Sequence, residues 1–163
     1  MYKKILTILV FCLFVSGLTG QNIRTKENFN SNWRFFLGQM ADAEKSGFND
    51  ASWRQLNLPH DWSIEGEFSE KNPASPGGGA LPGGLGWYRK TFRLTESDKA
   101  KKIFVEFDGV YRNSEVWING HSLGKRPFGY ISFSYELTPF LKFGNESNTI
   151  TVKVDNSQQP NSR

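Results

Sequence analysis

The Asn-Gly pair at positions 119 and 120 constrains the fold more than any other feature of the sequence. Apolar Val116 and Ile118 precede this pair in alternation with other residues, and Leu123 follows it. Alternation with a period of two is typical of a strand with one buried face. Asn-Gly is the strongest short hairpin signal, because a type I′ turn needs a positive φ at both central residues. The sequence therefore predicts an antiparallel hairpin here.

Short segments rich in aromatic and β-branched residues predict further strands on both sides of this hairpin. Residues 29–38 predict a turn followed by a first strand that ends at Gly38. The other predicted strands cover residues 55–59, 86–94, 102–107, 130–135 and 149–155, with Ile150, Val152 and Val154 facing inward in the last one. Asp50 and Pro139 each indicate one short helical turn. Many short strands with little helix predict an all-β fold, a β-sandwich or jelly roll.

Aromatic residues make up 15% of the chain, and two interpretations of them are open. We expect most of them in the core or on sheet faces, in particular Trp33, Trp87, Trp117, Phe92 and Phe107. Aromatic rings also form platforms on which sugars stack, because a pyranose presents apolar C–H faces.

The first 20 residues predict a secretory signal peptide, with Lys3 and Lys4 before a short apolar run and small residues at its end. A buried N-terminal helix or an uncleaved anchor is the alternative. Cys12 lies in this segment and is the only cysteine, so we expect a mature domain of residues 21–163 without disulfides, periplasmic or secreted. Phe11 precedes Cys12 where a lipid-attachment site requires a small residue.

Removing this segment takes away two of the 20 Lys and Arg residues and lowers the net charge from +4 to +2. This charge and the lack of a basic stripe argue against nucleic acid as a partner. We also expect no membrane association after cleavage.

The sequence shows no catalytic set and implies no cofactor and no metal. Two histidines are too few for a cluster of imidazole ligands. The loop at residues 66–86 is rich in Gly and Pro, but it lacks the Gly-Lys-Ser/Thr ending and the βαβ setting of nucleotide-binding loops. The best surface candidate is His60-Asp61-Trp62, which follows a predicted strand ended by Pro59. The alternative is that His60 and Asp61 only cap the turn after Pro59.

Four separated segments resemble the N-terminal sugar-binding domain of glycoside hydrolase family 2, in particular β-galactosidase-like enzymes of Bacteroidetes. They read SWRQLNLPHDWSIEGEF, GWYRKTFRL, FDGVYRNSEVWINGHSLGKRPFGYISFSYELTPFL and TVKVDNSQQPNSR. The resemblance implies a jelly-roll, galactose-binding-like β-sandwich, followed by an immunoglobulin-like domain and a TIM barrel that hydrolyses β-glycosides with retention.

In that family both catalytic carboxylates lie in the barrel, so the resemblance implies no catalytic residue in this chain. We interpret Asn145-Glu146 as a turn, although it looks like the family's acid/base motif. We also expect that a sandwich ending at Arg163 leaves an unpaired strand edge.

The resemblance further implies that loops of this domain narrow the subsite for the non-reducing sugar. The substrate-binding candidates by position are His60, Asp61, Trp62, Asp155, Asn156, Asn161 and Arg163. The implied partners are a carbohydrate, in particular a β-galactoside, and the remaining domains of a parent glycosidase. A free-standing carbohydrate-binding module and a structural domain without ligand are the alternatives. The glycine-rich loop would then be a rim of the site or an oligomer contact.

Overall fold

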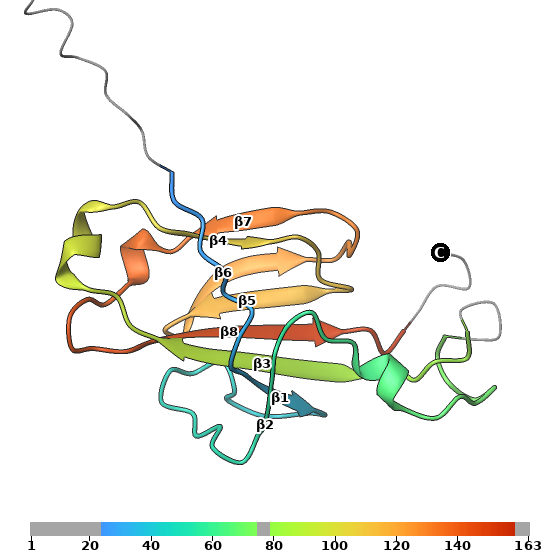
Figure 1. Ribbon diagram of the computed structural model, residues 1–163. Coiled ribbons are helices and arrows are strands. Elements are labelled where there is room, and N and C mark those ends of the chain that lie inside the picture. The colour runs from blue at the N-terminus through green and yellow to red at the C-terminus, as the bar shows by residue number, and fades with distance from the viewer. Residues whose placement is uncertain (1–23, 75–78, 159–163) are drawn as a thin grey trace, which may run out of the picture.

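The computed structural model describes residues 24–74 and 79–158 and shows an all-β sandwich, as predicted (Figure 1). Six strands form one antiparallel sheet in the order β2-β1-β3-β8-β5-β6, and two more pair as β4-β7. The strands are β1 (Trp33–Leu37), β2 (Arg54–Leu56), β3 (Leu85–Phe92), β4 (Phe104–Phe107), β5 (Ser114–Ile118), β6 (His121–Arg126), β7 (Phe133–Glu136) and β8 (Asn148–Asp155).

The Asn-Gly hairpin is confirmed between β5 and β6. Asn119 has a φ of 51° and Gly120 a φ of 84°, as the type I′ turn requires. The Asn119 side chain also ties the turn to its surroundings: Nδ2 donates to the Asn148 side chain, and Oδ1 accepts from the backbone N–H of Thr149. Asparagine is therefore needed here both for its backbone conformation and for its side-chain bonds.

Helical structure in the described residues is limited to three short 3₁₀ turns, η1 (Trp62–Glu65), η3 (Glu96–Ala100) and η4 (Thr138–Phe140). The turn predicted at Pro139 is confirmed as η4. The helical turn predicted at Asp50 is wrong, because Asp50 O accepts from Trp53 N in a tight turn and the chain then enters β2. Within the described part of the chain, no helix has the length and apolar character that a membrane span requires.

The strand predicted over residues 130–135 begins later, at Phe133. Its partner β4 ends at Phe107, which pairs with Phe133, so the residues before Phe133 have no ladder partner. Tyr130 and Ile131 instead lie exposed in the loop between β6 and β7. The sheet of β4 and β7 contains only two strands, so each has one strand neighbour among the described residues.

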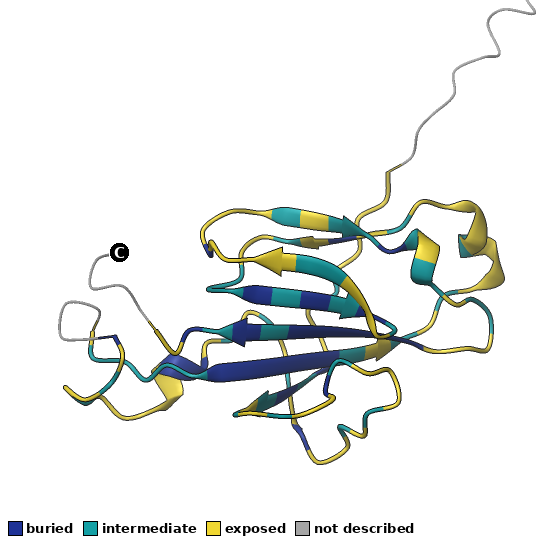
Figure 2. Ribbon diagram, turned by 180° about the vertical axis from the view of Figure 1, so that it is seen from behind, coloured by how far each residue is buried: buried dark blue, intermediate teal, exposed yellow. Residues whose placement is uncertain are grey.

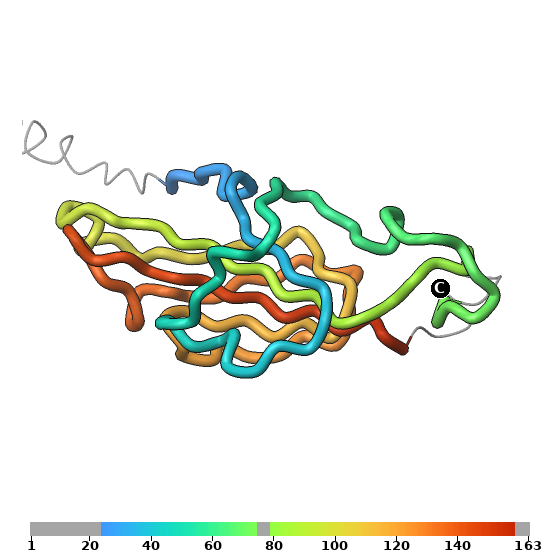
Figure 3. The backbone as a smooth tube through the Cα atoms, turned by 90° about the horizontal axis from the view of Figure 1, so that it is seen from below, coloured from blue at the N-terminus to red at the C-terminus, as the bar shows by residue number. Residues whose placement is uncertain are grey.

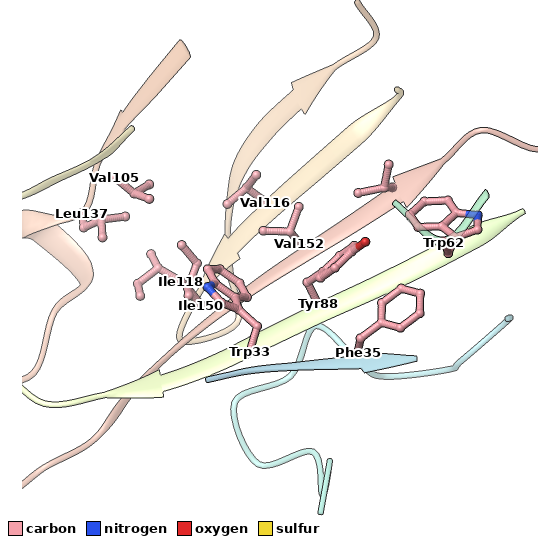
Figure 4. Close-up of a cluster of buried hydrophobic side chains, with 11 residues drawn as sticks. Trp33, Phe35, Trp62, Tyr88, Val105, Val116, Ile118, Leu137, Ile150 and Val152 are labelled. Carbon is pink, nitrogen blue, oxygen red and sulfur yellow. The ribbon is translucent and has the colours of Figure 1, made fainter. Parts of the chain in front are cut away.

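Two apolar clusters lie on opposite faces of the six-stranded sheet, whose central strands β3 and β8 are the most buried (Figure 2). The larger cluster fills the space toward β4 and β7 and includes Trp33, Ile150 and Val152 (Figure 4). Val154 belongs to the same cluster, so all three residues of β8 face inward as predicted. The smaller cluster is covered by the loop of residues 38–53 and includes Trp87. As expected, Phe92 and Phe107 pack partly buried against the larger cluster and Trp117 against the smaller.

Candidate functional site

The loop after β2 and the end of β8 meet at one end of the sandwich (Figures 1 and 3). Asn156 follows β8 directly, and its Nδ2 lies 3.5 Å from Oγ of Ser63 in η1. The backbone N–H of Asn156 also donates to Gly84 O, just before β3. The structure therefore brings together two of the segments that the sequence analysis selected as candidates.

Asp61 caps η1 and remains exposed. Its backbone is extended, and its Oδ1 accepts a hydrogen bond of 2.9 Å from the N–H of Ser63. No other described residue donates to the Asp61 carboxylate, so Oδ2 is available to a ligand. The capping role that the sequence left open is thus present, and it uses only one of the two carboxylate oxygens.

His60 contacts residues of β1, β2 and β3, and its side chain is nearly buried. Its Nδ1 lies 2.8 Å from Tyr88 Oη, and its Nε2 lies 2.7 Å from Nη2 of Arg54. Nε2 also lies 3.2 Å from Oε1 of Glu65, so on this side the ring contacts both a donor and an acceptor. The ring also packs edge-on against Phe35 with the centroids 4.6 Å apart. His60 therefore anchors the loop to β1, β2 and β3.

Arg54 and Glu65 extend this network to the surface. Arg54 Nη2 lies 2.9 Å from both carboxylate oxygens of Glu65, and this hydrogen bonding holds the pKa of Glu65 below its ordinary value. The same contact raises the pKa of Arg54. Burial raises the pKa of the Tyr88 hydroxyl, which stays protonated over the physiological range. The loop is thus held in place by charged and neutral hydrogen bonds.

Trp62 lies in the core. Its side chain stacks on Phe35 at 22° with the centroids 5.9 Å apart, and the residue is only 6% exposed (Figure 4). It also packs so closely under Gly86 that a Cβ there would lie 2.8 Å from the indole ring. The sugar contact predicted for Trp62 stays a prediction, but its ring is covered by protein in this structure.

The remaining candidates lie at or beyond the end of β8. Asp155 is partly exposed, and Ser157 donates to it from its backbone N–H and its hydroxyl, which lowers the pKa of the carboxyl group. Asn156 is buried, and its Oδ1 has no hydrogen-bond partner among the described residues. Asn161 and Arg163 lie outside the described residues. The substrate contacts assigned to all these residues stay predictions.

Two further loops reach the same end, and the sequence analysis did not select them. They cover residues 108–113, between β4 and β5, and residues 127–132, between β6 and β7. Asp155 N donates to Arg112 O at 3.0 Å, and Asn113 Nδ2 donates to Asp155 O at 3.1 Å. The signal that could have found the second loop is Pro127 and Gly129 on either side of an aromatic residue, because both favour turns.

A turn and a polar depression lie at the opposite end of the sandwich. Glu146 lies there in the loop before β8, beside Lys142 at 3.4 Å, and the interpretation of Asn145-Glu146 as a turn is confirmed. A shallow polar depression near the start of β1 is lined by Asn32, Arg34, Asp50, Gln55, Lys90 and Thr91. In residues 24–74 and 79–158 no three His, Cys, Asp or Glu side chains are grouped as a metal site.

The family model for glycosyl hydrolases family 2, sugar binding domain, matches residues 27–162. The chain belongs to this family. The resemblance of the four sequence segments to this family is therefore confirmed. The β-sandwich corresponds to the sugar-binding domain that the family model describes.

Its relatives are much longer enzymes. The β-galactosidase BoGH2A of Bacteroides ovatus is 61% identical over 140 residues, which are 86% of this chain and 16% of the relative. A putative β-glucuronidase of Formosa agariphila is 47% identical over 156 residues, which are 96% of this chain and 15% of the relative. This chain thus spans about a sixth of the length of these relatives.

The fold agrees with a solved family structure. The crystal structure of a β-glycosidase from Bacteroides vulgatus superposes with a TM-score of 0.76 at 55% sequence identity, covering 80% of this chain and 17% of that one. At this identity the likeness extends to sequence as well as fold.

Proposed function

We propose that this chain is the N-terminal domain of a β-galactosidase-like β-glycosidase, which hydrolyses O-glycosyl bonds of carbohydrates. The match of the sugar-binding family over residues 27–162 carries this proposal. Relatives named β-galactosidase and β-glucuronidase, of which the chain spans about a sixth, support it. Hydrolysis with retention needs two carboxyl groups about 5–5.5 Å apart, and in this proposal they lie in the remaining domains.

The domain contributes to substrate binding by shaping the subsite for the non-reducing sugar. Asp61 and the end of β8 lie at the same end of the sandwich and carry oxygen acceptors that suit sugar hydroxyls. The bonds of His60 to Tyr88 and Arg54 hold the loop of Asp61 in position. A binding group held by a rigid scaffold loses less conformational entropy when the sugar binds.

A galactoside is the preferred candidate substrate because the β-galactosidase of Bacteroides ovatus has 61% identity, whereas the named β-glucuronidase has 47%. A glucuronide differs in the carboxylate at C6, which calls for a cationic partner. Comparing turnover of 4-nitrophenyl β-galactoside and β-glucuronide separates the two sugars. A higher kcat/KM for the glucuronide would overturn the galactoside assignment.

Asp61→Asn in the full-length glycosidase is expected to lower kcat/KM by about tenfold or more. Its Oδ2 would lose the charge that strengthens a hydrogen bond from a sugar hydroxyl, a loss of about 1.5–3 kcal/mol. The asparagine keeps an oxygen that accepts from Ser63 N, so the cap of η1 and the melting temperature should be retained. Steady-state kinetics with the chromogenic substrate measure the effect.

Asp42→Asn is the matched control, since Asp42 is exposed on the loop that covers the other face of the sheet. It should leave kcat/KM within about twofold, as surface substitutions away from a site do. Equal kinetics of the Asp61 and Asp42 variants would show that Asp61 does not contact the substrate.

We also propose that the protein is exported, because residues 1–20, outside the described part, have the features of a secretory signal peptide. Mass spectrometry of the cell-envelope and secreted fractions is expected to find a mature chain that begins near Gln21. An intact N-terminus in the cytoplasmic fraction would contradict export.

A further inference from the structure

Tyr111, Phe128 and Tyr130 form an aromatic cluster at the end of the sandwich that carries the candidate site, with Phe128 and Tyr130 exposed and Tyr111 partly buried. The Tyr130 ring lies 5.2 Å from the Tyr111 ring and 5.7 Å from the Phe128 ring, measured between centroids. Tyr130 is 62% exposed and Phe128 is 57% exposed, with Ile131 exposed beside them. A contiguous group of exposed apolar side chains marks an interaction site, whereas single ones need no explanation.

The cluster is held in place by contacts between its two loops. Gly129 is buried against Tyr111, so closely that a Cβ would lie 2.6 Å from the ring and 2.8 Å from Cα of Tyr111. Ser132 Oγ donates to Asp108 O at 3.1 Å, and Asn113 N donates to Pro127 O. These contacts fix the loops that carry the exposed rings, so a ligand would meet them already arranged.

The cluster is continuous with the candidate site. Arg112 follows Tyr111 and accepts from Asp155 N through its carbonyl, while Asn113 donates to the carbonyl of Asp155. Asp155 itself is partly exposed, so a carboxylate lies next to the loop that carries Tyr111. Polar groups beside apolar rings are the usual composition of a ligand site. Sugars have this dual character, because a pyranose combines apolar C–H faces with hydroxyl groups.

We propose that the Tyr111–Phe128–Tyr130 cluster binds a second sugar unit of an oligosaccharide, beyond the non-reducing unit held near Asp61 and Asp155. This inference rests on the proposed function for its class of ligand. An enzyme that removes a terminal sugar keeps the rest of the glycan on the leaving-group side, so the cluster would contact that part. The domain would then favour oligosaccharides over simple glycosides.

Titration of the chain with defined glycans tests the proposal directly, without any turnover. The probes are β-linked tetrasaccharides ending in galactose or glucuronic acid, with methyl β-galactoside and methyl β-glucuronide for comparison. Ring resonances of Phe128 and Tyr130 in NMR spectra are expected to shift with a tetrasaccharide, which should bind about tenfold more tightly than the methyl glycosides.

Tyr130→Ala is expected to weaken tetrasaccharide binding about tenfold, whereas Tyr130→Phe keeps the ring and should stay within about twofold of the wild type. Phe104→Ala is the matched control, because Phe104 is 51% exposed on β4, away from the cluster. Equal melting temperatures would show that all variants fold.

Equal binding by the wild type and Tyr130→Ala, or no binding of any probe, would overturn the proposal. These outcomes differ from a failure of the proposed function. Glycan binding at the cluster without hydrolysis by the longer protein would refute only the enzymatic role, and hydrolysis without a ring response would refute only the aromatic subsite.

Discussion

Replacing Arg89 with methionine is expected to lower the free energy of unfolding by about 3–5 kcal/mol. Arg89 lies on β3, is 1% exposed, and donates from Nε to Oδ2 of Asp50 at 2.9 Å. Its Nη1 donates to Thr151 Oγ1 on the neighbouring strand β8, also at 2.9 Å. Methionine would leave the partly exposed Asp50 carboxylate without its ion-pair partner and the buried Thr151 Oγ1 without its donor, and both losses lower the stability.

The same guanidinium holds the loop of residues 38–53, which covers the smaller apolar cluster on one face of the six-stranded sheet. It donates to the backbone carbonyls of Ala43, Lys45 and Phe48. Arg89→Lys should also be destabilising, because one ammonium group cannot reproduce the planar fork of five donors. The smaller cluster around Trp87 would lose its cover together with these bonds.

Urea unfolding followed by tryptophan fluorescence measures this effect. Arg93→Met is the control, since Arg93 also lies close to β3 but, among the described residues, bonds only to Ser147 Oγ on the exposed surface. It should change the stability by less than about 0.5 kcal/mol. If Arg89→Met and Arg93→Met unfolded at the same urea concentration, Arg89 would not be the residue that secures this loop.

Trp62→Ala is the second substitution with a large expected effect, a loss of about 3–5 kcal/mol of unfolding free energy. Its buried indole fills the space between Phe35 and Gly86, and truncation would leave a cavity there. Trp62→Phe keeps part of the volume and should cost less. Trp62 follows Asp61 directly in this loop, so any loss of sugar binding in Trp62→Ala would accompany the loss of stability.

Calorimetry of the three proteins gives the order of melting temperatures, which should fall from the wild type through Trp62→Phe to Trp62→Ala. A Trp62→Ala variant that melts like the wild type and binds sugar poorly would contradict the core assignment. Trp62 would then contact the sugar, in line with its selection as a substrate-binding candidate.

The parts of the fold that the sequence predicts well have local causes. The type I′ turn depends on Asn119 and Gly120 themselves, and the alternation of Ile150, Val152 and Val154 indicates the buried face of β8. The start of β7 was misplaced because the alternation continues back to Tyr130, whereas the ladder ends where its partner β4 ends. Strand length is thus set by the neighbouring strand as well as by the strand's own residues.

The role of Arg89 could not be predicted from the pattern of β3. Its side-chain partners Asp50 and Thr151 lie 39 and 62 residues away in the sequence. The burial of Trp62 has a similar cause, because it requires the absence of a side chain at Gly86 on a different strand. Such long-range contacts appear only once the strands are paired.

Part of the candidate site was predictable through the family resemblance. The sequence placed the loop of Asp61 and the end of β8 in one site, and the structure brings Ser63 and Asn156 together there. The aromatic cluster at Tyr130 was not predicted, because the alternating aromatic run indicated a strand from Tyr130 onward, whereas Tyr130 lies in an exposed loop. Local patterns cannot distinguish the two when the pairing partner is unknown.

The most direct test of the proposed function is the release of nitrophenol from 4-nitrophenyl β-galactoside. It should be measured for residues 21–163 alone and for the protein translated through the coding sequence that follows codon 163. The proposal predicts no nitrophenol release by residues 21–163 and nitrophenol release by the extended protein. Turnover by residues 21–163 alone, or an extended protein without glycosidase activity, would contradict it.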